Sequence, residues 1–424
     1  MPSKKAFPTA LLLFALTNLA LYGLFHQKGL PQAKILDLSA LHRANYEARQ
    51  EGPWIWWVLR AYLGQPQTPD LAILGSSQMG SAIFSAEAEH RFEALDTTDQ
   101  REVTRLTDAV QKLNGRAPKV FNLSMGGAMV SDHYLVAKTL FSGKEKPKAV
   151  VIGVNPRDFL DNDLPAASAT DAFYFLSSYV DIENLAPVSF DGFFNLLDYK
   201  LKKHLPLKQV NTICKGNEPP SLANIATFTN PEGKGTLEKR KSQPLATQVL
   251  QAISGSAGDI RQGTWRVPAQ PPFSFVDNSR EYLRRYKRTN PPCLTGQKAY
   301  FHALLAYLKA QDIKVIVVGM PSMESNRHIL PASFWTTFKQ YLHDETVASG
   351  ASFVDLFGDQ RFVITDYLDT VHLNRFGGAK LISAIAGELN KRPDITAIMP
   401  AAAQSQSESP VDVQLSAGQQ KQWH

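Results

Sequence analysis

The sequence predicts an α/β protein whose central sheet is parallel and carries helices on both faces. Short apolar runs rich in valine and isoleucine recur along the chain, as expected for strands that are buried on both sides. Stretches of helical length lie between these runs, and strands that alternate with helices indicate parallel βαβ connections. The expected strands lie at residues 71–74, 119–123, 149–154, 313–319 and 352–356.

Helices are expected between these strands, so that one layer of helices covers each face of the sheet. The stretch from residue 85 to residue 113 is rich in glutamate, alanine, arginine and leucine, which favour helices. Four further helices are expected near residues 131–142, 296–311, 332–348 and 375–391. The result is a three-layer arrangement of helices, sheet and helices.

The alternation of strands and helices is interrupted between Asn155 and Ile313. Prolines and aromatic residues are frequent there and the periodicity is weak, so we interpret the interval as an insertion that carries a cap or a second lobe. The end of the chain is rich in alanine, glutamine and serine and is expected to be disordered. The chain thus divides into a membrane anchor, a connector, a first core part, the insertion, a second core part and a tail, at residues 1–28, 29–69, 70–160, 161–295, 296–395 and 396–424.

The composition excludes several classes of protein. Of the 424 residues, 44% are hydrophobic, which is close to the average of globular proteins and excludes a disordered chain. Two cysteines, Cys214 and Cys293, cannot build a disulfide scaffold or an all-cysteine zinc site, and whether they pair with each other stays open. The net charge of +6 suits ordinary solubility or an anionic partner. Because no nucleic-acid reader module accompanies it, we expect no nucleic-acid partner.

An apolar run near the N-terminus predicts a membrane anchor. Residues 8–25 carry no charge, and as a helix they would span about 27 Å, close to the roughly 30 Å of a hydrocarbon core. Lys4 and Lys5 precede the run, which favours a cytoplasmic N-terminus and a body in the periplasm or at the cell surface. A cleaved signal peptide is the competing interpretation, but the end of the run lacks the small residues that cleavage requires. The aromatic cluster at 53–57 rests either on the lipid surface or on the folded domain.

A serine marks the end of the first expected strand. Ser77 follows Gly75 and Ser76 at the junction between this strand and a helix. The carboxyl edge of a parallel sheet is where ligands bind in such folds, and the N–H groups of a helix N-terminus can stabilise an oxyanion. Ser77 is therefore a candidate nucleophile, although serine is also a preferred helix N-cap.

A histidine after the last expected strand provides a candidate base. Asp369 lies three residues before His372. An aspartate at this spacing can fold back and accept the imidazole N–H, which orients the ring and stabilises its protonated form. The alternative is that both residues belong to an ordinary surface loop.

Two other strand ends carry residues suited to an oxyanion hole. Asn155 follows the third expected strand, where its side-chain amide could donate to an oxyanion, although asparagine is also common in turns. Small residues follow the second strand, and their backbone N–H groups could point into the same site. The candidates are Ser124, Gly126 and Gly127. Whether the neighbouring Arg157 and Asp158 belong to the site stays open.

These four segments, in this order, resemble the SGNH (GDSL-type) hydrolase superfamily, which has a flavodoxin-like three-layer α/β fold. The resemblance covers about residues 70–160 and 310–392. It implies that Ser77 is the nucleophile, with His372 as base and Asp369 as the acid that orients it. It also implies an oxyanion hole formed by Asn155 and a backbone N–H of Ser124, Gly126 or Gly127. Two positions depart from the pattern, because Ser76 stands in place of the motif aspartate and Ser124 in place of a glycine.

The Gly-Ser-Ser motif, the single anchor and the long insertion resemble the membrane-anchored DltD-like branch of this superfamily. That resemblance implies a serine esterase or O-acyltransferase acting outside the cytoplasm on an acylated carbohydrate or envelope polymer, beside a membrane O-acyltransferase and without metal or cofactor. The departures at Ser76 and Ser124 motivate an alternative, a catalytically silent fold that serves as an envelope scaffold. A periplasmic ligand-binding protein fits less well, because such proteins usually have two similar halves and this chain contains no repeat.

Overall fold

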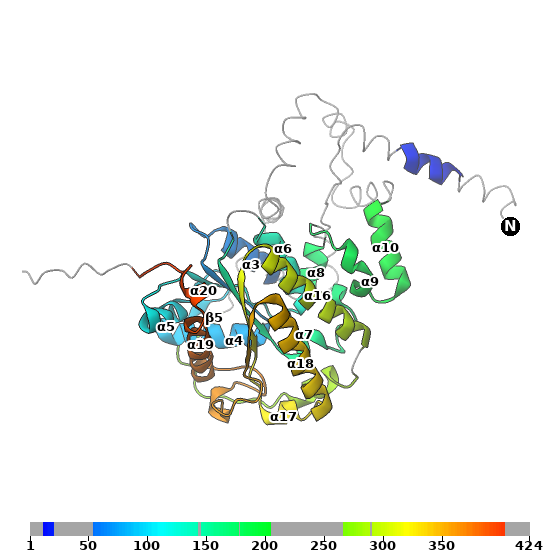
Figure 1. Ribbon diagram of the computed structural model, residues 1–424. Coiled ribbons are helices and arrows are strands. Elements are labelled where there is room, and N and C mark those ends of the chain that lie inside the picture. The colour runs from blue at the N-terminus through cyan, green and yellow to red at the C-terminus, as the bar shows by residue number, and fades with distance from the viewer. Residues whose placement is uncertain are drawn as a thin grey trace, which may run out of the picture.

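A parallel sheet of five strands forms the centre of the protein (Figure 1). The structure is a computed structural model that describes residues 12–20, 54–142, 146–177, 179–204, 266–288 and 291–402. The strands of the sheet are β1 (Leu71–Leu74), β3 (Val120–Asn122), β4 (Ala149–Val154), β6 (Lys314–Gly319) and β7 (Ser352–Asp355). All five coincide with the apolar runs of the sequence, which confirms the predicted parallel α/β class. The spatial order is β3-β1-β4-β6-β7, the flavodoxin-like doubly wound order.

Helices cover both faces of this sheet, as Figure 1 shows. The helices on one face are α4 (Ser77–Arg91), α5 (Thr104–Asn114) and α19 (Arg375–Asn390). Those on the other face are α6 (Val130–Leu140), α16 (Pro291–Ala310) and α18 (Ala332–Ser349). Strand β1 alternates between the two layers, because Leu71 and Ile73 pack with the first group and Ala72 and Leu74 with the second. The three-layer arrangement expected from the sequence is therefore present.

The register of the sheet brings two candidate residues to one edge. Leu74 of β1 lies opposite Ile152 of β4 in parallel register. Ser77 and Asn155 each follow three residues later, so both leave the sheet at its carboxyl edge. The chain reverses its direction of winding between β1 and β4, and ligands bind at such switch points in open α/β sheets.

One expected helix is in fact two helices. The helix predicted at 85–113 begins earlier, as α4, and ends at Arg91, where Phe92 takes the left-handed backbone conformation with φ 55°. The short strand β2 (Leu95–Asp96) follows and pairs antiparallel with β5 (Arg266–Val267) before α5 begins. Helices that end in this conformation usually carry glycine there, and Phe92 gives no such signal. The residue composition of 85–113 therefore gave no sign that the helix ends at Arg91.

Much of the described part of the insertion packs into the main core. Its helices are α8 (Asp171–Leu176), α9 (Ala186–Ser189), α10 (Gly192–His204) and α15 (Ser279–Arg285), with short 3-10 turns at 167–169 and 183–185. The short helix α7 (Pro156–Phe159) closes the first core part, and a 3-10 turn at 364–366 lies in the second. Phe173 and Phe175 of α8 are fully buried in the same cluster as β1 and β4. Residues 205–265, which include Cys214, lie outside the described residues.

The aromatic cluster that precedes the sheet packs on the folded domain. It begins helix α3 (Trp54–Leu63), and Ile55, Trp57 and Leu59 of this helix are almost fully buried. Of the two positions that the sequence allowed for the cluster, contact with the domain is the one observed.

The C-terminal part of the chain is ordered further than the sequence predicts. Helix α20 (Pro393–Thr396) and the residues up to 402 pack on the domain, with Met399 buried and Pro400 accepting a backbone hydrogen bond from Ala117. An ordered segment thus extends past residue 396, and residues 403–424 lie outside the described part. Residues 12–20 are helical. Within the described residues no helix is long and apolar enough to cross a membrane. Residues 8–11 and 21–25 of the expected anchor lie outside the described residues.

Candidate active site

Ser77 stands at the first turn of α4, directly above the carboxyl end of β1. The chain turns from strand to helix at Gly75, where a Cβ atom would lie 2.4 Å from Cβ of Met79, so only glycine fits this turn. Ser76 is the N-cap residue, but its hydroxyl does not cap the helix. Ser77 is thereby placed at a helix N-terminus with its side chain at the edge of the sheet.

His372 and Asp369 complete a chain of hydrogen bonds that starts at Ser77. Nε2 of His372 lies 2.9 Å from Oγ of Ser77, and Nδ1 lies 2.6 Å from Oδ2 of Asp369. The other oxygen of Asp369 accepts the backbone N–H groups of Val371 and His372, at 2.9 and 2.8 Å. Burial raises the pKa of Asp369, but the hydrogen bond and charge of His372 and the backbone N–H groups outweigh it and bring the pKa below its usual value. Asp369 is therefore an ionised partner that fixes the orientation of the imidazole.

Close packing of two helices holds Ser77 beside the histidine loop. Helix α19 starts immediately after this loop, with Asn374 as its N-cap. A Cβ atom at Gly378 would lie only 2.0 Å from the backbone oxygen of Ala82 in α4, so the two helices touch backbone to backbone. The Ser81 hydroxyl also donates to the carbonyl of Leu373 at 2.9 Å. The candidate nucleophile Ser77 and the candidate base His372 are thus held beside each other by the close packing of α4 and α19.

The insertion supports the other side of the same loop. The backbone N–H of Val276 donates to Leu368 at 2.9 Å, and Val276 forms a parallel bridge with Asp369. The side-chain oxygen of Asn278 accepts the N–H of Thr370 at 3.1 Å. These contacts were not predicted, because residues 266–288 carry no motif that links them to the end of the chain.

The structure narrows the backbone candidates for an oxyanion hole. The N–H of Ser124 is already committed to Oδ1 of Asn122, at 3.0 Å, and the Ser124 hydroxyl is buried. Gly126 and Gly127 are exposed, and among the described residues neither N–H has an acceptor. Gly127 has φ 76°, a conformation that favours glycine. The two glycines therefore remain able to donate to a ligand, and Ser124 does not.

Asn155 lies next to the nucleophile segment, but its amide is already hydrogen-bonded. Nδ2 donates to Oδ2 of Asp158 at 2.7 Å and to Oγ of Ser76 at 3.2 Å, while Oδ1 accepts the N–H of Arg157 at 2.9 Å. Asp158 also accepts the N–H of Asn155, which completes a capping box at the start of α7. The spacing of Asn155 and Asp158 in the sequence already indicated this capping box. It would have predicted that Asp158 contacts Asn155 and therefore lies beside the candidate site.

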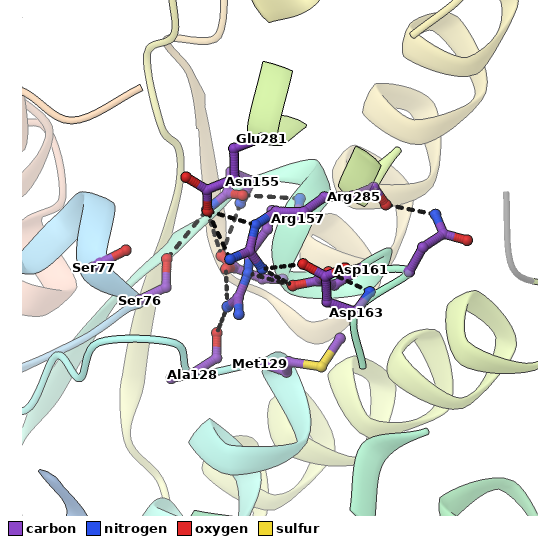
Figure 2. A network of polar contacts seen from close by, with 12 residues as sticks. Ser76, Ser77, Ala128, Met129, Asn155, Arg157, Asp161, Asp163, Glu281 and Arg285 are labelled. Carbon is purple, nitrogen blue, oxygen red and sulfur yellow. Dashed lines mark hydrogen bonds and ion pairs between the residues drawn. The ribbon is translucent and has the colours of Figure 1, made fainter. Parts of the chain in front are cut away.

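Arg157 connects this corner of the site to the insertion, as Figure 2 shows. Its guanidinium donates to Asp161 at 3.0 Å and to the carbonyl of Ala128 at 2.8 Å. Asp161 is fully buried and also pairs with Arg285 of α15. A continuous polar network therefore runs from Ser76 to helix α15.

Asp158, like Asp161, is a fully buried carboxyl of this network, and burial changes the titration of Asp158. Burial raises its pKa to about 7, against smaller opposing effects of Arg157, Ser76 and Asn155. Between pH 4 and pH 7 the folded protein therefore holds a proton that the unfolded chain has lost, so this group's contribution to stability falls as the pH rises.

The Asp158→Asn variant is expected to remove this part of the pH dependence. Relative to the wild type, its free energy of unfolding should therefore increase, so that the variant becomes comparatively more stable as the pH rises from 5 to 8. Urea unfolding of both proteins at the two pH values measures this difference, with the exposed Asp344→Asn as control for the lost charge. An equal difference at both pH values would contradict the assignment of a raised pKa to Asp158.

The fold and the site together define the class of the molecule. It is an α/β protein of flavodoxin-like strand order with a Ser-His-Asp arrangement at the carboxyl edge of its sheet. No protein-family model matches the chain, and no curated protein matches its sequence. Within the described residues, no group of three or more His, Cys, Asp or Glu side chains could hold a metal ion.

Proposed function

We propose that this protein is a serine esterase or O-acyltransferase of the SGNH type. The observation that carries the proposal is the unbroken chain from Ser77 through His372 to Asp369, with hydrogen-bond distances of 2.9 and 2.6 Å. Ser77 lies almost 300 residues before the Asp369–His372 pair in the sequence, yet the three side chains meet with the geometry that a nucleophile, a general base and an orienting acid require. Their place at the switch point of the sheet supports the same conclusion.

The proposed reaction proceeds through an acyl-enzyme. Nε2 of His372 takes the Ser77 proton while Oγ attacks the ester carbonyl, and Asp369 stabilises the imidazolium. Collapse of the tetrahedral intermediate breaks the ester bond, and His372 gives its proton to the leaving alcohol. Water or an acceptor hydroxyl then attacks the acyl-enzyme and gives its proton to His372. The bond between the acyl group and Oγ of Ser77 breaks, and His372 returns the proton to Oγ. Backbone N–H groups of Gly126 or Gly127 and the Asn155 amide would hold the oxyanion.

We propose an acylated carbohydrate or envelope polymer as substrate and a location outside the cytoplasm. The charge pattern around residues 8–25 supports a membrane anchor. Helix α10 adds a second observation, because its adjacent Phe193 and Phe194 are 69% and 82% exposed. Exposed aromatic residues of this kind suit a lipid interface. A membrane O-acyltransferase that supplies the acyl group fits the same location.

Covalent labelling distinguishes this proposal from the alternative of a silent scaffold. The wild-type chain is expected to react with a fluorophosphonate probe, losing fluoride and forming one phosphonyl ester per molecule. Mass spectrometry of proteolytic fragments should locate the adduct on Ser77. A folded wild-type protein that stays unlabelled would favour the scaffold, and an adduct on another residue would contradict the assignment of the nucleophile.

A further inference from the structure

The amide group of Asn155 is held from three directions in one orientation. Its oxygen faces the backbone N–H of Arg157, and its nitrogen faces Asp158 and Ser76. A rotation of the amide by half a turn would set an oxygen against a carboxylate and an N–H against an N–H. The structure therefore fixes which end of Asn155 points toward the serine segment.

Both N–H bonds of this amide are occupied, which matters for a group expected to bind an oxyanion. The bond to Asp158 is short, at 2.7 Å, whereas the bond to Ser76 is longer, at 3.2 Å. Ser76 is the neighbour of Ser77 in the chain, so an oxyanion formed on Ser77 would develop near the Ser76 hydroxyl. The weaker bond is the one that an oxyanion can replace, while the bond to Asp158 persists.

Asp158 makes more contact with Asn155 than a helix cap requires. The capping box needs only the bond from the Asn155 backbone N–H to Oδ2, at 3.1 Å. The same oxygen also accepts the side-chain amide, and Oδ1 has no hydrogen-bond partner among the described residues. The nearest cation to Oδ1 is Arg157, at 3.9 Å. Burying a carboxyl group whose Oδ1 has no hydrogen-bond partner among the described residues costs stability, which suits a role other than stability.

We propose that Asp158 is a positioning residue of the oxyanion hole. It holds one N–H of Asn155 so that the other can move from the Ser76 hydroxyl to the oxyanion on the Ser77 adduct. This inference rests on the proposed function. Ser76 stands where the motif has an aspartate. The carboxyl group of Asp158, from the start of α7, lies on the other side of the Asn155 amide and brings a carboxyl group to this part of the site.

A double-mutant cycle on the full chain tests this role. The variants are Asn155→Ala, Asp158→Ala and the double variant, each assayed for hydrolysis of p-nitrophenyl acetate and for the rate of fluorophosphonate labelling. Loss of one oxyanion donor typically lowers kcat about 10²-fold. We expect Asp158→Ala to lower kcat by at least about 10-fold with KM changed less than about 3-fold, and to have no further effect in the Asn155→Ala background. Asp158→Asn, which keeps an acceptor oxygen, should recover part of the loss.

Asp132 provides a matched control for the helix cap. It is also fully buried and also caps its helix, accepting the N–H of Met129 at 2.8 Å, but it contacts none of the proposed catalytic residues. Asp132→Ala should lower the midpoint temperature of thermal unfolding. Its kcat, calculated per molecule that the fluorophosphonate can label, should equal that of the wild type. Equal losses from Asp158→Ala in both backgrounds would overturn the inference and show a structural role only. If Ser77→Ala is still labelled, the proposed function fails instead, so the two failures are distinguishable.

Discussion

The Ser77→Ala variant is expected to lose all labelling by a fluorophosphonate and to hydrolyse p-nitrophenyl acetate at least about 10⁴-fold more slowly than the wild type. The side chain that would form the covalent bond is absent, and among the described residues no second hydroxyl lies at hydrogen-bond distance from His372. The substitution removes one half-buried hydroxyl at the edge of the sheet and should leave the fold intact. Labelling and steady-state hydrolysis of the purified chain measure the effect.

The control for this prediction is Ser383→Ala. Ser383 lies on the exposed side of α19 and its hydroxyl bonds only within its own helix, to Ala379 at 2.9 Å. This variant should react like the wild type. His372→Ala should lose nearly as much activity as Ser77→Ala, and the double variant should be no worse than either, because the two residues act as one unit. Additive losses, or residual labelling of Ser77→Ala, would contradict the triad.

The strands and the three proposed catalytic residues could be predicted because each follows from a local pattern in the sequence. A strand buried on both faces needs an uninterrupted apolar run, so β1, β4 and β6 stand out in the sequence. Residues that directly follow such strands lie at one edge of a parallel sheet, which made Ser77 and Asn155 candidates for one site. The spacing to Asp369 then made His372 a candidate base, because three residues suffice for the loop to fold back.

The parts that escaped prediction depend on contacts without a local pattern. Asn278 supports the histidine loop from a segment about ninety residues away in sequence, and no periodicity connects the two. The break after α4 occurs at Phe92, which lacks the usual residue type for its backbone conformation. Helix α3, which begins at Trp54, packs on the domain through buried side chains. The sequence allowed this position and a position on the lipid surface, and gave no reason to choose between them. Only Asp158 left a readable signal, through its capping box.

The Gly378→Ala variant is expected to be strongly destabilised, by about 3 kcal/mol or more. The added methyl group would lie 2.0 Å from the backbone oxygen of Ala82 and 3.0 Å from Cβ of Ala86. A backbone atom within a helix cannot move aside alone, so α4 and α19 must separate. Helix α4 carries Ser77 and α19 follows His372, and separation would therefore lengthen the bond between these two residues. Labelling by a fluorophosphonate should slow even in the molecules that remain folded.

Gly387→Ala in the same helix is the matched control, because a Cβ atom there would meet nothing within 4 Å. Replacing a helix glycine by alanine without a clash raises stability by up to about 1 kcal/mol, since the unfolded chain loses freedom. Urea unfolding of the wild type and both variants measures the contrast. The same chemical change should thus have opposite signs at two positions nine residues apart. Equal stability of the two variants would mean that α4 and α19 are not in backbone contact, and that the proximity of Ser77 and His372 has another cause.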